Sequence, residues 1–289
     1  MGKKSWWGKP GRALRTALGW LLEGFNPLAE INFLVSSVGY RKQVGINYGR
    51  LERQKLDVYS PKGEARDLPV VVFFYGGSLQ SGRRKDYRFV AEALTARGFV
   101  AVIPDYRVYP EAKFPTFIED GASAVSWAWT HIDRFGGDSS RLFLMGHSAG
   151  AYIAAMLALN PCYLERVGMS TDDLRGFIGI AGAYDFLPNK NPRLIEIFGG
   201  TDGITETQPI NFVTASAPPA LLLHGAKDSI VPPRNTESLA ERLREVNRPV
   251  VATIYPQYRH LMILFVLASP LQDGEPVMAD IAHFIRAQK

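Results

Sequence analysis

A serine set among small residues, in Gly146-His147-Ser148-Ala149-Gly150, has the surroundings of a catalytic nucleophile. The five residues match the pattern G-x-S-x-G. The apolar run Leu142–Met145 before them fits a buried strand, and the Ala-rich run that continues to Leu159 fits a helix. A strand, a tight turn and a helix in this order form a nucleophile elbow, where small neighbours let strand and helix approach closely. We therefore predict that Ser148 is the attacking group; the alternative is a glycine-rich structural turn.

A serine hydroxyl needs a base to remove its proton and an acid to orient that base. In chains with this elbow, the acid and then the base follow the serine. Asp228 comes shortly after the predicted strand Ala220–His224, in a loop at the carboxyl end of the sheet. Asp185 lies just past the preceding strand and is the alternative acid, and Asp202 is also downstream. The loop position favours Asp228.

Two histidines follow Asp228 and could supply the base. His260 follows the predicted strand Val250–Tyr255 on a loop, from which its side chain can reach over the sheet. His283 lies in the middle of a predicted helix, which favours a packed or surface role. We predict His260 as the base, interpret His147 and His224 as structural, and place His131 on the face of a helix.

The negative charge that develops on the substrate oxygen requires hydrogen-bond donors. The backbone N–H of Ala149, next to the nucleophile, is one predicted donor. The loop after the apolar strand 70–74 contains Gly76 and Gly77, whose lack of side chains lets the backbone turn its N–H groups toward the charge. We predict an oxyanion hole from Gly76, Gly77 and Ala149; the alternative is a plain Gly-Gly turn.

These residues need a parallel sheet to hold them, and after residue 50 predicted strands and helices alternate. The strands are 54–60, 69–75, 98–103, 141–145, 177–181, 220–224 and 250–255; the helices are 86–97, 116–135, the run to 159, 235–246 and 275–287. The first strand alternates polar and apolar residues, which is typical of an edge. The second is continuously apolar, which is typical of a buried central strand. The alternation predicts an α/β fold over one mostly parallel sheet.

Several motifs in chain order resemble those of the α/β-hydrolase superfamily. They are Tyr75-Gly76-Gly77-Ser78, Asp105-Tyr106-Arg107-Val108-Tyr109-Pro110-Glu111, Phe114-Pro115, Gly136-Gly137-Asp138, the elbow, Gly225-x-x-Asp228 and His260. Within the superfamily, the chain is most similar to the branch of hormone-sensitive-lipase-like esterases, bacterial feruloyl-type carboxylesterases, kynurenine formamidases and prenylcysteine methylesterases. The resemblance covers about residues 50–289. It implies the α/β-hydrolase fold and gives the Asp105–Glu111 segment a bracing, non-catalytic role.

One motif departs from this family. Tyr75 stands where relatives usually have histidine, and Ser78 where an aromatic residue or glycine is common. The backbone donors survive the change, because Gly76 and Gly77 remain. The hydrogen bonds that support the loop, and the shape of the acyl pocket, must differ from those of relatives.

The composition excludes several other classes of protein and of site. The single cysteine, Cys162, excludes an internal disulfide and a cysteine-based zinc site, and we expect neither a metal nor a cofactor. No run of eighteen uncharged apolar residues is present, so no transmembrane helix is expected. The net charge is +5, but beyond residue 15 basic and acidic residues are interspersed, which argues against a nucleic-acid partner.

Residues 1–50 are predicted to be a basic, aromatic-rich N-terminal extension, and residues 51–289 the catalytic domain. The first fifteen residues have no acid, and the segment to residue 22 mixes cations with tryptophan and leucine: Lys3, Lys4, Trp6, Trp7, Lys9, Arg12, Leu14, Arg15, Leu18, Trp20, Leu21 and Leu22. Such a mixture fits peripheral contact with an anionic membrane, or packing against the core or a second subunit. It does not read as a signal peptide, so a cytoplasmic location, with or without membrane contact, is expected.

The predicted function is a serine carboxylesterase that hydrolyses small, short-acyl esters through an acyl-enzyme. The stretch of about residues 185–218, between two predicted strands, is short, so the cap is small and the cleft open. An arylformamidase using the same three residues on an amide is the main alternative. A peptidase, a thioesterase and a hydrolase-fold binding protein without catalysis are further alternatives, although the last usually lacks one of the three residues.

Overall fold

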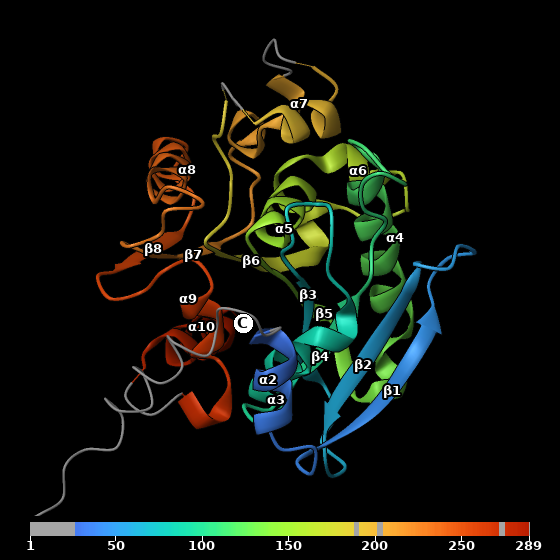
Figure 1. Ribbon diagram of the computed structural model, residues 1–289. Helices are drawn as coiled ribbons and strands as arrows, with labels where there is room; N and C mark the ends of the chain where they lie inside the picture. Colours follow the sequence, from blue (N-terminus) through green and yellow to red (C-terminus); the bar gives the residue numbers. More distant parts are fainter. Residues whose placement is uncertain (1–26, 188–190, 201–204, 272–274, 289) are drawn as a thin grey trace, which may run out of the picture.

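The computed structural model describes residues 27–187, 191–200, 205–271 and 275–288, and within them eight strands form one sheet (Figure 1). Their order across the sheet is β1-β2-β4-β3-β5-β6-β7-β8. β1 and β2 run antiparallel to their neighbours, whereas β3 to β8 pair in parallel. The strands are β1 (Tyr40–Asn47), β2 (Lys55–Pro61), β3 (Leu68–Phe74), β4 (Val100–Pro104), β5 (Gly137–His147), β6 (Leu174–Ile180), β7 (Ala220–Gly225) and β8 (Val250–Tyr255).

Helices cover both faces of the sheet (Figure 1), which confirms the predicted α/β architecture. α4, α5 and α8 lie on one face, and α3, α9 and α10 on the other. The α-helices are α2 (Pro27–Leu34), α3 (Arg88–Thr95), α4 (Thr116–His131), α5 (Ala149–Leu159), α6 (Pro161–Glu165), α7 (Pro192–Phe198), α8 (Arg234–Glu245), α9 (Met262–Phe265) and α10 (Val277–Ala287). Short 3₁₀ turns include η1 (Arg84–Tyr87), η2 (Ile132–Phe135) and η5 (Pro209–Phe212).

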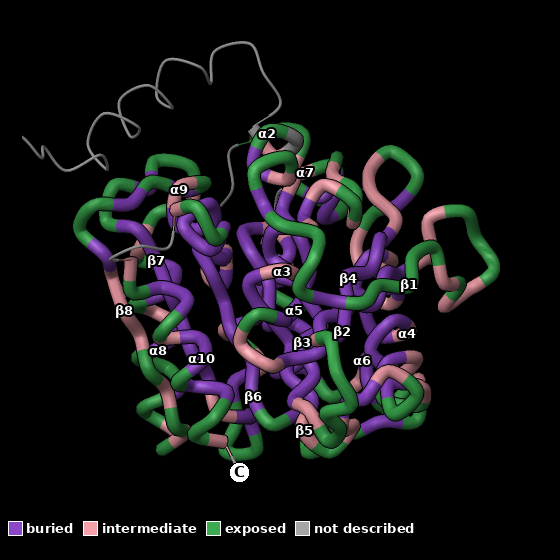
Figure 2. The backbone as a smooth tube through the Cα atoms, turned by 90° about the horizontal axis from the view of Figure 1, so that it is seen from below, coloured by how far each residue is buried: buried purple, intermediate pink, exposed green. Residues whose placement is uncertain are grey.

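The core lies between these two helical layers and the centre of the sheet, where the tube in Figure 2 is buried. Every residue of β3 after Leu68 is buried, as its continuous apolar sequence predicts for a strand covered on both faces. α5 is buried along almost its whole length, because the Ala-rich run packs against both β5 and β6. This packing holds the turn before α5 rigidly in place.

The predicted edge position of residues 54–60 is wrong. β2 lies between β1 and β4, and its five central residues are buried. On this side of the sheet the edge strand is β1, whose exposed Arg41, Lys42 and Gln43 give it too polar a sequence to be recognised as a strand. The sheet therefore begins at Tyr40, within the segment assigned from the sequence to the N-terminal extension.

The segment between β6 and β7 lies over the carboxyl ends of the parallel strands, where α7 is seen at the top of Figure 1. Phe198 at the end of α7 packs its ring against Phe114, Phe117, Tyr152 and Phe186. These ring contacts fix a small cap to α4 and α5. Residues 188–190 and 201–204 of this segment, and residues 1–26 with the basic and aromatic side chains, lie outside the described residues.

Candidate active site

Ser148 occupies a strained turn between β5 and α5, with φ 54° and ψ −120°. The turn is possible because the residues two positions before and after Ser148, Gly146 and Gly150, have no side chain. A Cβ on Gly146 would lie 2.2 Å from the carbonyl oxygen of Gly150, and a Cβ on Gly150 would lie 2.0 Å from that of Phe74. The small residues of the motif are thus required by the close approach of β5, α5 and β3, as a nucleophile elbow demands.

The structure brings Ser148, His260 and Asp228 into one hydrogen-bonded chain. His260 Nε2 lies 2.9 Å from Ser148 Oγ, and His260 Nδ1 lies 2.7 Å from Asp228 Oδ2. Because a carboxylate only accepts, Nδ1 carries the proton and Nε2 is free to accept one from the serine. All three side chains are buried, so only a small part of each is exposed to solvent. The arrangement can generate a serine nucleophile.

Asp228 receives four hydrogen bonds. The N–H groups of Ile230 and Val231 donate to Oδ1 at 2.9 and 3.0 Å, and both His224 and His260 donate to Oδ2. Burial opposes ionisation of this carboxyl group, but the hydrogen bonds from the two histidines outweigh burial and hold its pKa well below the usual range. Asp228 is therefore a carboxylate throughout the neutral range.

Neither Asp185 nor His283 belongs to this hydrogen-bonded chain. The backbone N–H of Asp185 donates to the side chain of Asn235, and its carboxylate is not among the hydrogen-bond partners of His260. Asp202 lies outside the described residues. His283 is exposed on α10.

His224 has a contact that the sequence did not reveal. Its Nε2 lies 3.1 Å from Asp228 Oδ2 and 2.9 Å from the carbonyl oxygen of Val231; both atoms accept, so Nε2 carries the proton. Its Nδ1 lies 2.8 Å from Thr236 Oγ1, which then donates to it. His224 is fully buried and contacts the same oxygen of Asp228, Oδ2, as His260 does. In the sequence, the signal for this contact was the position of His224, four residues before Asp228.

His147, the variable residue of the elbow, contacts the backbone of His260. Its Nε2 is 2.9 Å from the carbonyl oxygen of His260, so this nitrogen donates. Burial, reinforced by the nearby His260 ring, lowers the pKa of His147 to about 3. The side chain is therefore a neutral clamp that ties the elbow to the loop of His260.

The three predicted oxyanion donors lie beside the elbow. A Cβ on Gly76 would lie 3.1 Å from Ser148 Cβ, so this loop passes directly against the serine. Gly77 has φ +132°, a conformation suited to glycine, and its carbonyl accepts from Gln80 and Ser81. Ala149 opens α5, where the first N–H groups have no acceptor within the helix.

Tyr75 holds the Gly76-Gly77 loop in place through its hydroxyl, its carbonyl and its ring. Its hydroxyl lies 2.7 Å from Asp105 Oδ1, and Arg53 Nη2 donates to it at 3.0 Å. The carbonyl of Tyr75 accepts from the Tyr106 hydroxyl at 2.7 Å, and the two rings stack. Asp105 is in turn paired with Arg84. Burial, with the neighbouring Tyr106 and Asp105, raises the pKa of Tyr75 well above its ordinary value, so it remains a hydroxyl.

A pocket of about 370 Å³ opens in front of Ser148 and Ala149. Among its described lining residues Arg234, on α8, is the one charged side chain. The remaining wall is mostly apolar and comes from the oxyanion loop, α5, the cap and the loop before α8: Ser78, Leu79, Tyr152, Ala183, Phe186, Asn191, Leu194, Phe198, Ile230, Val231, Pro232 and Asn235. Over the described residues, no group of three His, Cys, Asp or Glu side chains could hold a metal ion, and no helix could span a bilayer.

Comparison with solved structures shows the same fold in known esterases. An esterase from Pyrobaculum calidifontis aligns with a TM-score of 0.74 and 22% identity, covering 96% of this chain and 98% of that chain. Esterase 2 from Thermogutta terrifontis, with propionate bound, aligns with a TM-score of 0.72 and 23% identity over 86% of this chain and 94% of that chain. At these identities the likeness concerns the fold.

Sequence comparison identifies the family. Esterase LipC from Mycobacterium tuberculosis is 31% identical over 223 residues, which cover 71% of this chain and 55% of LipC. A probable isoprenylcysteine alpha-carbonyl methylesterase from Arabidopsis thaliana is 28% identical over 79% of this chain and 52% of its own length. The chain thus spans about half the length of these relatives, whose names agree with the predicted ester-hydrolysing enzyme. Residues 56–243 match the BD-FAE family. The chain therefore belongs to the BD-FAE family, within the α/β-hydrolases.

Proposed function

We propose that this protein is a serine carboxylesterase of small, short-acyl esters. The observation that carries the proposal is the hydrogen-bonded chain from Ser148 through His260 to Asp228, which faces a pocket at the carboxyl ends of the parallel strands. Relatives named as esterases and carboxylic ester hydrolases support the same reaction class.

In the proposed reaction, His260 Nε2 takes the proton of Ser148 as Oγ bonds to the ester carbonyl carbon. The N–H groups of Ala149 and the Gly76-Gly77 loop stabilise the resulting oxyanion, each donor contributing about 2.7–4 kcal/mol in the transition state. The tetrahedral intermediate collapses, and protonated His260 gives its proton to the departing alkoxide. Water, deprotonated by His260, then attacks the acyl carbon, and His260 returns this proton to Ser148 Oγ as the bond to Oγ breaks and the acid is released.

The pocket supports small substrates. Its volume of about 370 Å³ is near the lower end for small-molecule sites, and apolar side chains dominate the wall. The cap contributes Leu194 and Phe198 to that wall and lies close against α5. A short acyl chain fits this space, whereas a long one must leave it.

A panel of p-nitrophenyl esters from acetate to palmitate tests the proposal. We expect kcat/KM to peak at short chains and Ser148→Ala to abolish turnover while circular dichroism remains unchanged. A residual activity of about a tenth of wild type would exclude Ser148 as the nucleophile. A peak at palmitate would refute the assignment of short-acyl specificity.

A second candidate is an arylformamidase. A kynurenine formamidase from Salmo salar is 31% identical over 148 residues, half of this chain. The same three residues can cleave an activated amide, so the experiment is a direct competition between N-formylkynurenine and p-nitrophenyl butyrate. A higher kcat/KM for N-formylkynurenine would establish the formamidase.

We also propose that the N-terminal extension packs against its own core or a second subunit. Support comes from α2, directly after residues 1–26, where Phe33 and Leu34 are exposed and available for covering. Deleting residues 1–26 should then lower the melting temperature or change the oligomeric state. Unchanged values for both, with loss of salt-sensitive sedimentation on anionic vesicles, would instead establish membrane contact.

A further inference from the structure

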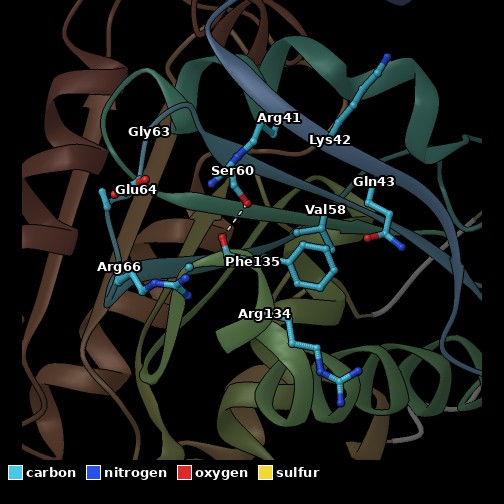
Figure 3. A pocket seen from close by; sticks show the side chains of 12 residues that line it. Arg41, Lys42, Gln43, Val58, Ser60, Gly63, Glu64, Arg66, Arg134 and Phe135 are labelled. Atoms are coloured by element: carbon cyan, nitrogen blue, oxygen red, sulfur yellow. Dashed lines mark hydrogen bonds between the residues drawn. The ribbon is translucent and has the colours of Figure 1, made fainter.

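A second cavity lies away from Ser148, at the other end of the sheet. It has a volume of about 630 Å³ and is bordered by β1, β2, the loop before β3 and the turn η2 (Figure 3). That loop and η2 lead into the amino ends of β3 and β5, whereas Ser148 follows the carboxyl end of β5. The eleven residues of β5 separate the two ends by roughly 30 Å. A substrate in the catalytic pocket cannot reach this cavity, which we call the basic groove.

The basic groove is rich in positive charge. Four of its lining side chains are basic, Arg41, Lys42, Arg66 and Arg134, and one, Glu64, is acidic. Across the described residues, none of the four cations takes part in an ion pair, in contrast to Arg84 and Arg107 elsewhere in the protein. Each exposed cation is hydrated and attracts an anion only weakly alone, but several around one concavity act together.

Hydrogen bonds fix the walls of the groove. Ser60 Oγ donates to the carbonyl of Phe135 at 2.9 Å, drawn as the dashed line in Figure 3, and joins β2 to η2. The N–H of Leu68 donates to the carbonyl of Gly136 at 3.1 Å. Gly136 has φ +83°, and a Cβ there would lie 2.9 Å from the carbonyl oxygen of Ala65, so the two loops are in close contact. The backbone that carries the basic side chains is therefore preformed.

Two of the arginines face the same space. In Figure 3 the guanidinium groups of Arg41 and Arg66 lie on opposite sides of the Ser60–Phe135 hydrogen bond, while Lys42 points away from it. A guanidinium group presents paired N–H donors that match two oxygens of one acceptor. A carboxylate carries a single charge and has its two oxygens in one plane, so its geometry matches the paired donors of one guanidinium group. A phosphate group offers enough oxygens, and enough charge, for both.

We propose that the basic groove binds a phosphate group, held between Arg41 and Arg66. The same chemistry occurs in a soluble phosphate compound and in a phospholipid headgroup, so two probes are needed. Pyrophosphate represents the first source, and phosphatidylcholine vesicles that contain phosphatidic acid represent the second. The site acts independently of the ester chemistry at Ser148.

Binding to both probes is measured at physiological salt, by calorimetry for pyrophosphate and by sedimentation for vesicles. The test variant is Arg41→Gln/Arg66→Gln. The control, Arg50→Gln/Arg244→Gln, makes the same change in charge at exposed arginines outside the groove. We expect wild type and control to bind at least one probe, and the test variant to bind it at least about tenfold more weakly. Esterase turnover should be the same in all three proteins.

The outcomes separate the sources and can overturn the proposal. Pyrophosphate binding identifies a soluble ligand, and binding to vesicles alone identifies a phospholipid. If neither probe binds to wild type, the proposal is wrong. It is equally wrong if the control loses as much affinity as the test variant, because attraction would then come from overall charge. Unchanged circular dichroism of the test variant shows that lost binding is not lost folding.

Discussion

Replacing Tyr75 by phenylalanine isolates the hydroxyl that stands where relatives carry a histidine. The substitution keeps the ring, which stacks on Tyr87 and Tyr106 at centroid distances of 5.1 and 4.8 Å. It removes one hydrogen bond to the carboxylate of Asp105 and one acceptor for Arg53. Any effect of Tyr75→Phe therefore measures the hydroxyl alone.

The expected loss in the free energy of unfolding follows from the hydrogen bonds that Asp105 and Arg53 keep in Tyr75→Phe. A hydrogen bond to a charged group contributes about 1.5–3 kcal/mol, more than a neutral one. Asp105 keeps Arg84, whose backbone N–H donates at 2.7 Å, and Arg53 keeps the carbonyl of Gly82 at 2.9 Å. Neither group is left alone, so we expect the lower value, a loss of about 1.5 kcal/mol in the free energy of unfolding.

In Tyr75→Phe, kcat should fall with little change in KM. Tyr75 precedes Gly76 and Gly77, and a shifted donor weakens the oxyanion interaction, which matters most in the transition state. Since the stacked ring still holds the loop, we expect a loss in kcat of less than about tenfold, below the loss of an entire donor. Tyr75→Ala also removes the ring, and should lower kcat by more than about a hundredfold.

Urea denaturation and steady-state kinetics with p-nitrophenyl butyrate measure both effects. Tyr184→Phe is the matched control, because the Tyr184 hydroxyl is buried and has no hydrogen-bond partner among the described residues. An unchanged urea midpoint and kcat in Tyr75→Phe would refute the argument that the hydroxyl anchors the loop. Equal losses in Tyr184→Phe would show that the hydrogen bonds are not the cause.

Four further predictions concern the residues around Ser148. His260→Ala should reduce kcat nearly as much as Ser148→Ala, since a nucleophile and its base act as a unit. A residual activity of about a tenth of wild type would contradict the proposed role of His260 as the base. Asp228→Asn should be milder but still severe, whereas Asp185→Asn should be silent; the reverse order would show that the acid is misassigned. His224→Phe should lower kcat by roughly ten- to a hundredfold with KM unchanged and shift the pH–rate profile, because Asp228 loses one of its two imidazole partners; an unshifted profile would leave His224 with packing alone. For His147, the unfolded chain binds a proton near pH 6.5 but the folded protein only near pH 3, so this residue's contribution to stability is complete above pH 6.5 and is lost as the pH falls toward 3. Urea midpoints at pH 7 and pH 5 should therefore differ less in His147→Gln than in wild type, and equal differences would exclude His147 as a source.

The parts of the molecule that were predictable from sequence depend on local signals. The elbow around Ser148 was recognisable because strand, turn and helix each have a local pattern. Asp228 and His260 were selected by chain order and loop position, and the structure places both in hydrogen-bond contact with their predicted neighbours. β3 was recognised as central because burial on both faces leaves an unbroken apolar run.

The features that the sequence did not reveal depend on tertiary contacts. β1 has one exposed edge and a polar sequence, so only pairing with β2 makes it a strand. α7 is too short to show helical periodicity, and its end is held by aromatic rings from distant segments. The contact between His224 and Asp228 requires a loop geometry that residue types alone do not specify. Such features arise from packing rather than from propensity.

The clamp formed by His147 changes how the motif G-x-S-x-G should be used on this chain. The pattern treats its second position as free, yet here that side chain contacts a carbonyl 113 residues away in the sequence. A Cβ on Gly76 would also lie 3.0 Å from His147 Nδ1, so the oxyanion loop leaves this ring little space. In a directed-evolution library, the residues tolerated at position 147 would therefore depend on the residue at position 76, and randomising position 147 alone would mostly yield inactive clones.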